Sequence, residues 1–178
     1  MTRILLLLGS LRAASVNRQL AELAVEVAPN GVTLTLFDRL GEFPFYNEDI
    51  DTGDVGDPVT ELRREAERAD AVLVVTPEYN ASIPGVLKNA IDWLSRPYGK
   101  GALKGKPLAV IGASLGSYGD TWAHDETRKS FAIAGPRVVD SIKLSVPLKT
   151  LNGVHPREHA ELADKVRAVV ADLAAEAQ

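Results

Sequence analysis

The chain has 178 residues, of which 46% are hydrophobic and 25% charged, and its formal net charge is −4. These values predict one soluble globular domain over residues 1–178, and the acidic balance argues against nucleic-acid binding. The absence of cysteine excludes disulfides, thiol catalysis and cysteine-bound metals, and no apolar stretch is long enough to span a membrane. We therefore expect a cytoplasmic protein that has no membrane partner.

Strand and helix patterns alternate along the whole chain. Short apolar runs predict strands, and periodic apolar positions bounded by proline or glycine predict helices. In chain order the elements are a strand at 3–8, a helix at 17–28, a strand at 33–37, a helix from Pro58 with Asp57 as its cap, a strand at 71–76, a helix at 84–94, a strand at 107–111, a helix at 121–134, a strand at 141–146 and a helix at 156–175. The alternation is typical of an α/β fold, in which helices cover both faces of a parallel sheet.

Two folds have this order of elements. One is the flavodoxin-like three-layer sandwich, whose five-stranded parallel sheet has the order 2-1-3-4-5, and the other is half of a dinucleotide-binding fold. In the second fold an acidic residue about twenty positions beyond the first loop binds a ribose, and Asp38 has that position. The glycines that accompany it are missing, which favours a turn role for Asp38.

The segment from Gly9 to Asn17 joins the first predicted strand to the first helix. Unpaired N–H groups at a helix N-terminus favour an anion there, and Ser10, Ser15 and Asn17 add hydrogen-bonding groups. Arg12 adds a forked cation. Neither G-x-G-x-x-G nor the Walker A pattern is present, so a terminal phosphomonoester fits better than a pyrophosphate. A plainer alternative is that Ser15 or Asn17 only caps the helix, while Arg12 is solvated.

Two further loops follow the third and fourth predicted strands. Pro77 and Pro84 stiffen the first of them, and its polar and aromatic side chains suit a planar group with polar edges. The second, at 112–119, carries three glycines that let a ligand approach the backbone: Gly112, Gly116 and Gly119. In the flavodoxin order the loops after strands one, three and four meet at one edge of the sheet, so we expect a single crevice.

The chain resembles the NADPH-dependent FMN reductase family, which includes azo dye, quinone and chromate reductases of flavodoxin-like fold. The resemblance lies in GSLRAASVN at residues 9–17 and in PEYNASIPGVLKNAIDW at residues 77–93, the longer and more specific motif. It weakens after Gly119, where the chain reads DTWAHD over residues 120–125. Contacts that relatives make with that segment are not carried over to this chain.

The resemblance implies which residues hold the cofactor. Four residues of the first loop would bind the FMN phosphate: Ser10, Arg12, Ser15 and Asn17. Four residues of the second would line the isoalloxazine, largely through backbone groups near its N5–O4 edge: Pro77, Glu78, Tyr79 and Asn80. Three residues of the third would contact the ring: Ser114, Leu115 and Gly116.

The function implied is an NAD(P)H-dependent FMN reductase or quinone-type reductase. FMN would take hydride at N5 from NADPH or NADH and pass electrons to a small acceptor, such as a free flavin, a quinone, an azo dye or a metal oxyanion, in a ping-pong mechanism. No catalytic side chain is required for this chemistry. Two alternatives are a flavodoxin-like electron carrier and a non-catalytic FMN-binding interaction module.

Four other features have less specific interpretations. The H-x-x-E-H pattern at 155–159 matches a zinc motif, but Pro156 opens the last predicted helix, so no metal site is expected. His124 is expected at the surface. The apolar stripe of the helix at 84–94 is wide, which favours a homodimer or homotetramer over burial by residues 96–101. The aromatic residues of the connection after the second strand fit either the core or a wall of the substrate space: Phe43, Phe45 and Tyr46.

Overall fold

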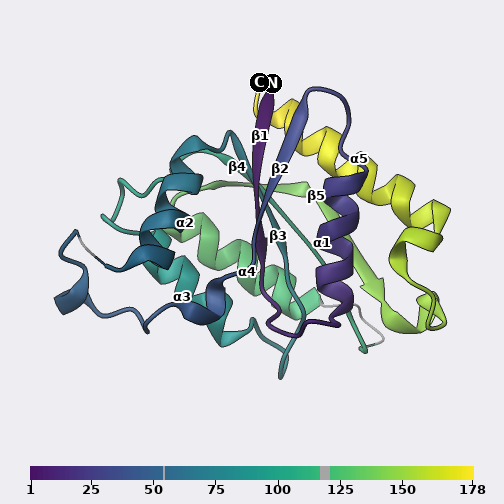
Figure 1. Ribbon diagram of the computed structural model, residues 1–178, viewed down its shortest axis with the longest axis horizontal. Coiled ribbons are helices and arrows are strands. Elements are labelled where there is room, and N and C mark those ends of the chain that lie inside the picture. Colours follow the sequence, from purple (N-terminus) through teal and green to yellow (C-terminus); the bar gives the residue numbers. More distant parts are fainter. Residues whose placement is uncertain (54, 117–120) are drawn as a thin grey trace.

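The computed structural model describes residues 1–53, 55–116 and 121–178. The fold is built around a five-stranded sheet (Figure 1). The strand order is β2-β1-β3-β4-β5, and each neighbouring pair is parallel. The bounds are β1 (Thr2–Leu8), β2 (Val32–Phe37), β3 (Ala71–Val75), β4 (Pro107–Ser114) and β5 (Arg137–Pro147). This is the order 2-1-3-4-5, so the flavodoxin-like α/β fold is confirmed and the dinucleotide alternative is wrong.

Helices cover both faces of this sheet (Figure 1). On one face lie α1 (Val16–Glu26) and α5 (Ala160–Glu176), and on the other α2 (Asp57–Arg68), α3 (Gly85–Leu94) and α4 (Thr121–Ala134). Short 3-10 turns occupy parts of the connections, at η1 (Leu40–Glu42), η2 (Glu48–Ile50), η3 (Leu148–Leu151) and η4 (Pro156–Glu158). No helix within the described ranges combines the length and the apolar composition needed to cross a bilayer.

The interior strand β1 shows how the sequence determines these layers. Successive side chains of a strand point to opposite faces. Ile4, Leu6 and Leu8 pack with residues of α1 and α5, whereas Leu5 and Leu7 pack with residues of α2 and α3. Both sets are buried, which explains why the strand is a continuous apolar run rather than an alternating one.

Several element boundaries differ from the sequence predictions. The fourth strand does not end at residue 111, because pairing with β5 continues through Gly112↔Ser145 to Ser114↔Pro147. The last helix begins at Ala160, since Pro156 opens the separate turn η4. Asp57 is the first residue of α2 rather than its cap, a position that Gly56 holds. The first difference affects the site, because Gly112 and Ser114 are strand residues rather than loop residues.

Candidate functional site

A cavity of about 260 Å³ opens at the carboxyl ends of β1, β3 and β4. Its lining includes every residue predicted for cofactor binding except Asn80, which lies on the adjacent turn: Ser10, Arg12, Ser15, Asn17, Pro77, Glu78, Tyr79, Ser114, Leu115 and Gly116. Val16, Ala113 and Leu148 complete it. Leu148 was not predicted. It directly follows β5, which is the neighbour of β4 in the sheet order 2-1-3-4-5. The predicted sheet order could therefore have indicated that the end of β5 also reaches the cavity.

The first loop of the cavity ends in a capped helix. Ser15 has extended backbone angles and its hydroxyl accepts a hydrogen bond from the N–H of Asn17 at 3.2 Å, which is the geometry of an N-cap. Ser10 and Ser15 are both buried, and Arg12 is exposed at the rim. The capping alternative for Ser15 is therefore confirmed, and the same residue also lines the cavity.

Asn17 has a role that the sequence did not reveal. Its Nδ2 donates to the carbonyl of Ala113 at 2.8 Å, and its Oδ1 accepts from the N–H of Ala113 at 2.9 Å. Both groups are buried, so the amide side chain fixes the start of α1 against the end of β4. The distance between the first and third loops is set by this pair.

The second loop contains a tight, strained turn. The N–H of Tyr79 donates to the carbonyl of Ser82, and the N–H of Ser82 donates to the carbonyl of Tyr79, each at 3.0 Å. Between them Asn80 and Ala81 have φ of 53° and 58°. Asparagine tolerates this left-handed region, whereas alanine is strained there. The loop is thus more constrained than the flanking prolines alone predict.

Helix α4 holds this turn from one side. The Oε2 of Glu78 accepts from the N–H of Ala123 at 3.1 Å, and the hydroxyl of Ser82 donates to Oε2 of Glu126 at 2.9 Å. A carboxylate at a helix N-terminus is favoured by the helix dipole. The side chain of Glu78 therefore orders the first turn of α4, while its residue also lines the cavity.

The third loop is short in the part that the structure describes. The N–H of Gly116 donates to the hydroxyl of Ser114 at 3.3 Å, and the Leu115 side chain is 88% exposed. Gly119, predicted to allow close approach of a ligand, lies outside the described residues. Gly112 serves another purpose than the predicted one, because a side chain there would lie 2.1 Å from the Thr76 carbonyl oxygen and 2.8 Å from Nε2 of His124.

His124 is not at the surface, so that prediction is wrong. The residue is 1% exposed, and its Nδ1 lies 3.1 Å from the hydroxyl of Ser145 on β5. Burial first, and the charge of Arg128 next, lower the pKa of His124 from its ordinary 6.5 to about 4, against the opposing effect of Asp125. The imidazole is therefore neutral at pH 7.

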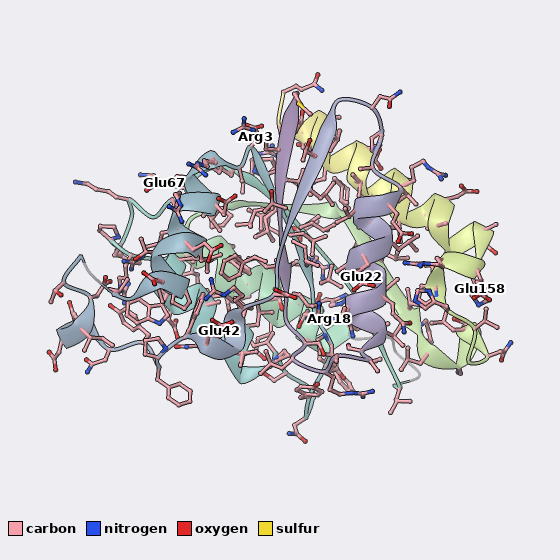
Figure 2. The ribbon with its side chains drawn as sticks, in the orientation of Figure 1. Arg3, Arg18, Glu22, Glu42, Glu67 and Glu158 are labelled. Atoms are coloured by element: carbon pink, nitrogen blue, oxygen red, sulfur yellow. The ribbon has the colours of Figure 1, made fainter. Side chains whose placement is uncertain are left out.

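Asp38 does not face the cavity as a ribose-binding acid would. It forms an ion pair of 2.8 Å with Arg18, which projects from α1 (Figure 2). Asp38 directly follows β2, in the connection that leads to η1.

The residues of the H-x-x-E-H pattern are engaged locally. Nδ1 of His155 accepts from the N–H of Arg157, and Nε2 of His159 lies 3.2 Å from the carbonyl of Leu151. Across the described positions, no cluster of three or more histidine, aspartate and glutamate residues is arranged to hold a metal ion.

The wide apolar stripe of α3 is explained largely within the chain. Trp93 donates to the carbonyl of Pro44 at 2.9 Å and meets the ring of Tyr46 edge-on, with centroids 5.0 Å apart. Asn89 bonds the backbone of the same segment. Residues 43–46 thus cover the part of the stripe around Asn89 and Trp93, and Gly101 lies against the backbone at the end of the helix. Phe43 is core, Tyr46 is half-buried and Phe45 is exposed.

The fold and the cavity together define a class. A doubly wound parallel sheet, a mononucleotide-sized cavity at its carboxyl edge and a helix N-terminus in that cavity are the features of flavodoxin-like mononucleotide-binding proteins. Comparison with known proteins shows to which family of this class the chain belongs.

Residues 2–150 match the model of the NADPH-dependent FMN reductase family. A quinone reductase of Pseudomonas putida is 40% identical over 166 residues, which is 92% of this chain and 86% of the relative. An NAD(P)H-dependent FMN reductase of Pseudomonas aeruginosa is 35% identical over 94% of this chain and 89% of its own. The structure of FerB, a flavoenzyme NAD(P)H:(acceptor) oxidoreductase from Paracoccus denitrificans, superposes with a TM-score of 0.79 at 33% identity, with 97% of each chain covered. The chain belongs to the NADPH-dependent FMN reductase family and is an oxidoreductase of that family.

Proposed function

We propose that the cavity binds FMN, with the phosphate at the N-terminus of α1 and the ring system between the second and third loops. The observation that carries this proposal is the cavity itself, which gathers predicted residues from three separate loops. Ser10, Arg12, Ser15 and Asn17 would surround the phosphate. Residues 77–80 and 114–116 would contact the isoalloxazine.

The residues present fit a phosphomonoester. The N-terminal N–H groups of α1 carry partial positive charge, two buried hydroxyls flank them, and Arg12 can approach from the rim. The amide of Asn17 is already bonded to Ala113, so its part in phosphate binding falls to its backbone and to its hold on the loop. When bound, FMN supplies hydride acceptance from a nicotinamide and reduction of a second molecule.

The protein then acts as an NAD(P)H-dependent reductase of small acceptors. Quinones are the favoured class, because the relatives of Pseudomonas putida are quinone reductases, and free flavins, azo dyes and metal oxyanions are further candidates. Tyr79 and Leu115 are exposed apolar side chains on the cavity lining and offer a surface for a planar acceptor. A shared surface for nicotinamide and acceptor predicts ping-pong kinetics.

The experiment is a direct one. Purified protein is titrated with FMN while flavin fluorescence is followed, and the complex is assayed for oxidation of NADPH and NADH with a benzoquinone. Tight binding with turnover supports the proposal. Binding without turnover would identify an electron carrier or interaction module instead, and absence of binding would overturn the cofactor assignment. Kinetics that require both substrates to be bound together would contradict the ping-pong order.

We also propose assembly as a homodimer or homotetramer through the exposed faces of α3 and α4. Ile133 is 66% exposed and Tyr98 72% exposed beside a shallow hollow that includes Ile91 and Lys88. Apolar side chains gathered in this way are typical of a protein contact. Light scattering of the full chain tests this, since a monomer at all concentrations would contradict it.

A further inference from the structure

A row of closely packed groups runs beneath the three loops of the cavity and consists of Gly9, Thr76, Gly112 and His124. Each loop begins close to this row: the first at Gly9, the second after Thr76 and the third after Ser114, two residues beyond Gly112. A side chain at Gly9 would lie 2.7 Å from the hydroxyl of Thr76, and one at Gly112 would meet both the Thr76 carbonyl and the His124 ring. The two glycines therefore leave the space that Thr76 and His124 occupy.

His124 closes this row from α4. Its Nδ1 faces the hydroxyl of Ser145 at 3.1 Å, and the ring lies against the backbone of Thr76 and Gly112. These neighbours fit a neutral imidazole that donates toward the Thr76 carbonyl and accepts from the serine hydroxyl. One side chain thus touches the ends of β3, β4 and β5.

His124 is also tied to the second loop through its neighbour in sequence. The N–H of Ala123 donates to the carboxylate of Glu78, so the first turn of α4 cannot move without moving that loop. The charged groups that act on the pKa of His124 are Arg128 and Asp125, both on α4. The Glu78 carboxylate binds the N–H of Ala123, the residue that precedes His124. The other two histidines of the chain, His155 and His159, are only half-buried and lie far along the sequence from this row.

We propose that His124 is a positioning residue of the flavin site, which sets the spacing between the second and third loops by joining the ends of β3, β4 and β5. This inference rests on the proposed function, because it concerns the same cavity. His124 lies in the segment where the resemblance to the family weakens, so it is a feature of this chain rather than of the shared motifs.

The test compares two substitutions on the same helix. H124L removes the ring nitrogens at similar size, so the Ser145 hydroxyl loses its partner and the Thr76 backbone loses a polar neighbour. F131L shortens a fully buried side chain two turns further along α4, away from the cavity. We expect the Kd for FMN to rise about tenfold in H124L, the scale of one to two lost buried hydrogen bonds, and to stay within about twofold in F131L.

Two further readouts separate positioning from general loss of stability. H124Q keeps a donor and an acceptor and is expected to restore most of the affinity, and the visible bands of bound FMN should change in H124L but not in F131L. Equal Kd values for H124L and the unchanged protein, or equal losses in H124L and F131L at matched melting temperatures, would overturn the inference.

If H124L does not fold, S145A tests the inference in its place. This variant removes only the hydroxyl at Nδ1 and is expected to weaken FMN binding about threefold. Unchanged affinity in S145A would then overturn it. Unaltered protein that binds no FMN would instead contradict the proposed function, and the inference with it.

Discussion

The first and second loops of the cavity are held in place in different ways. The first depends on a local N-cap, Ser15, and on one long-range amide, Asn17, which grips the backbone of β4. The second depends on a strained turn at Asn80 and Ala81 and on contacts with α4, through Glu78 and Ser82. The phosphate end of the proposed site is therefore ordered by helix α1 and β4, and the ring end by helix α4.

This difference indicates where each end is vulnerable. A helix N-terminus presents its N–H groups as soon as the helix forms, so the first loop needs few supports beyond its cap. The second loop needs the contacts from α4, because a turn with an alanine in the left-handed region is strained by itself. Changes around α4 should alter the second loop first.

The largest effect is expected at Gly112 on β4, which packs against Thr76 at the start of the second loop. G112A would place a methyl group 2.1 Å from the Thr76 carbonyl oxygen, which forces β3 and β4 apart. We expect a loss of at least about 3 kcal/mol in the free energy of unfolding, measured by urea denaturation. Gly85 is the matched control, since nothing lies within 4 Å of a side chain there. A G112A protein as stable as G85A would contradict this packing.

Lowering the pH should destabilise helix α4 around His124, and with it the contacts that hold the second loop. Between pH 6.5 and pH 4 the unfolded chain binds a proton at His124 that the folded chain does not, so the free energy of unfolding falls as the pH is lowered through this window. The full contribution is about 3 kcal/mol from a pKa lowered to about 4. Urea denaturation at pH 7 and pH 4 measures it, and H124Q should lose less stability over the same interval. Parallel losses in both proteins would show that carboxylates alone are responsible.

The support of the first loop is tested by N17A. This change leaves the buried N–H and carbonyl of Ala113 unpaired, and we expect a loss of about 2 kcal/mol together with weaker FMN binding. N30A alters an exposed asparagine and should stay within about 0.5 kcal/mol of the unaltered protein. Equal stabilities of N17A and N30A would mean that the cap alone orders this loop.

The smallest effect is expected from a substitution that relieves the strain of the turn in the second loop. Ala81 has φ of 58°, which glycine adopts without penalty, so A81G should stabilise the protein by about 0.5 to 1 kcal/mol in thermal unfolding. A132G, at an exposed position inside α4, should have the opposite sign. Destabilisation by A81G would indicate that the turn is not strained in the way its angle implies.

Local patterns were sufficient to predict the sheet and the loops that meet at the cavity, whereas the individual lining residues came from the family resemblance. Apolar runs such as Leu5–Leu8 identify buried strands, and the order of strands and helices then determines which loops meet. The role of Ser15 as a cap could be considered from sequence because its partner is two residues away.

What sequence could not predict depends on partners far along the chain. Asn17 meets Ala113, 96 residues away, and Glu78 meets Ala123, 45 residues away. His124 is buried only because Gly112 leaves room for it and Ser145 offers a hydroxyl. The end of β4 was misjudged for the same reason, since pairing with β5 overrides the loop-like run of small residues at 112–114.

The contact between Glu78 and helix α4 has a consequence for evolution. The glutamate belongs to the motif by which a flavin site is recognised, yet its carboxylate accepts from the backbone of Ala123 and so serves the fold. Selection for a stable helix would retain it in a descendant that had lost its cofactor. Retention of Glu78 in a lineage would therefore reflect the inherited fold. In the first loop the Ser15 hydroxyl also serves the fold as a helix cap, so retention of Ser10 and Arg12 would be the better indication that flavin chemistry was kept.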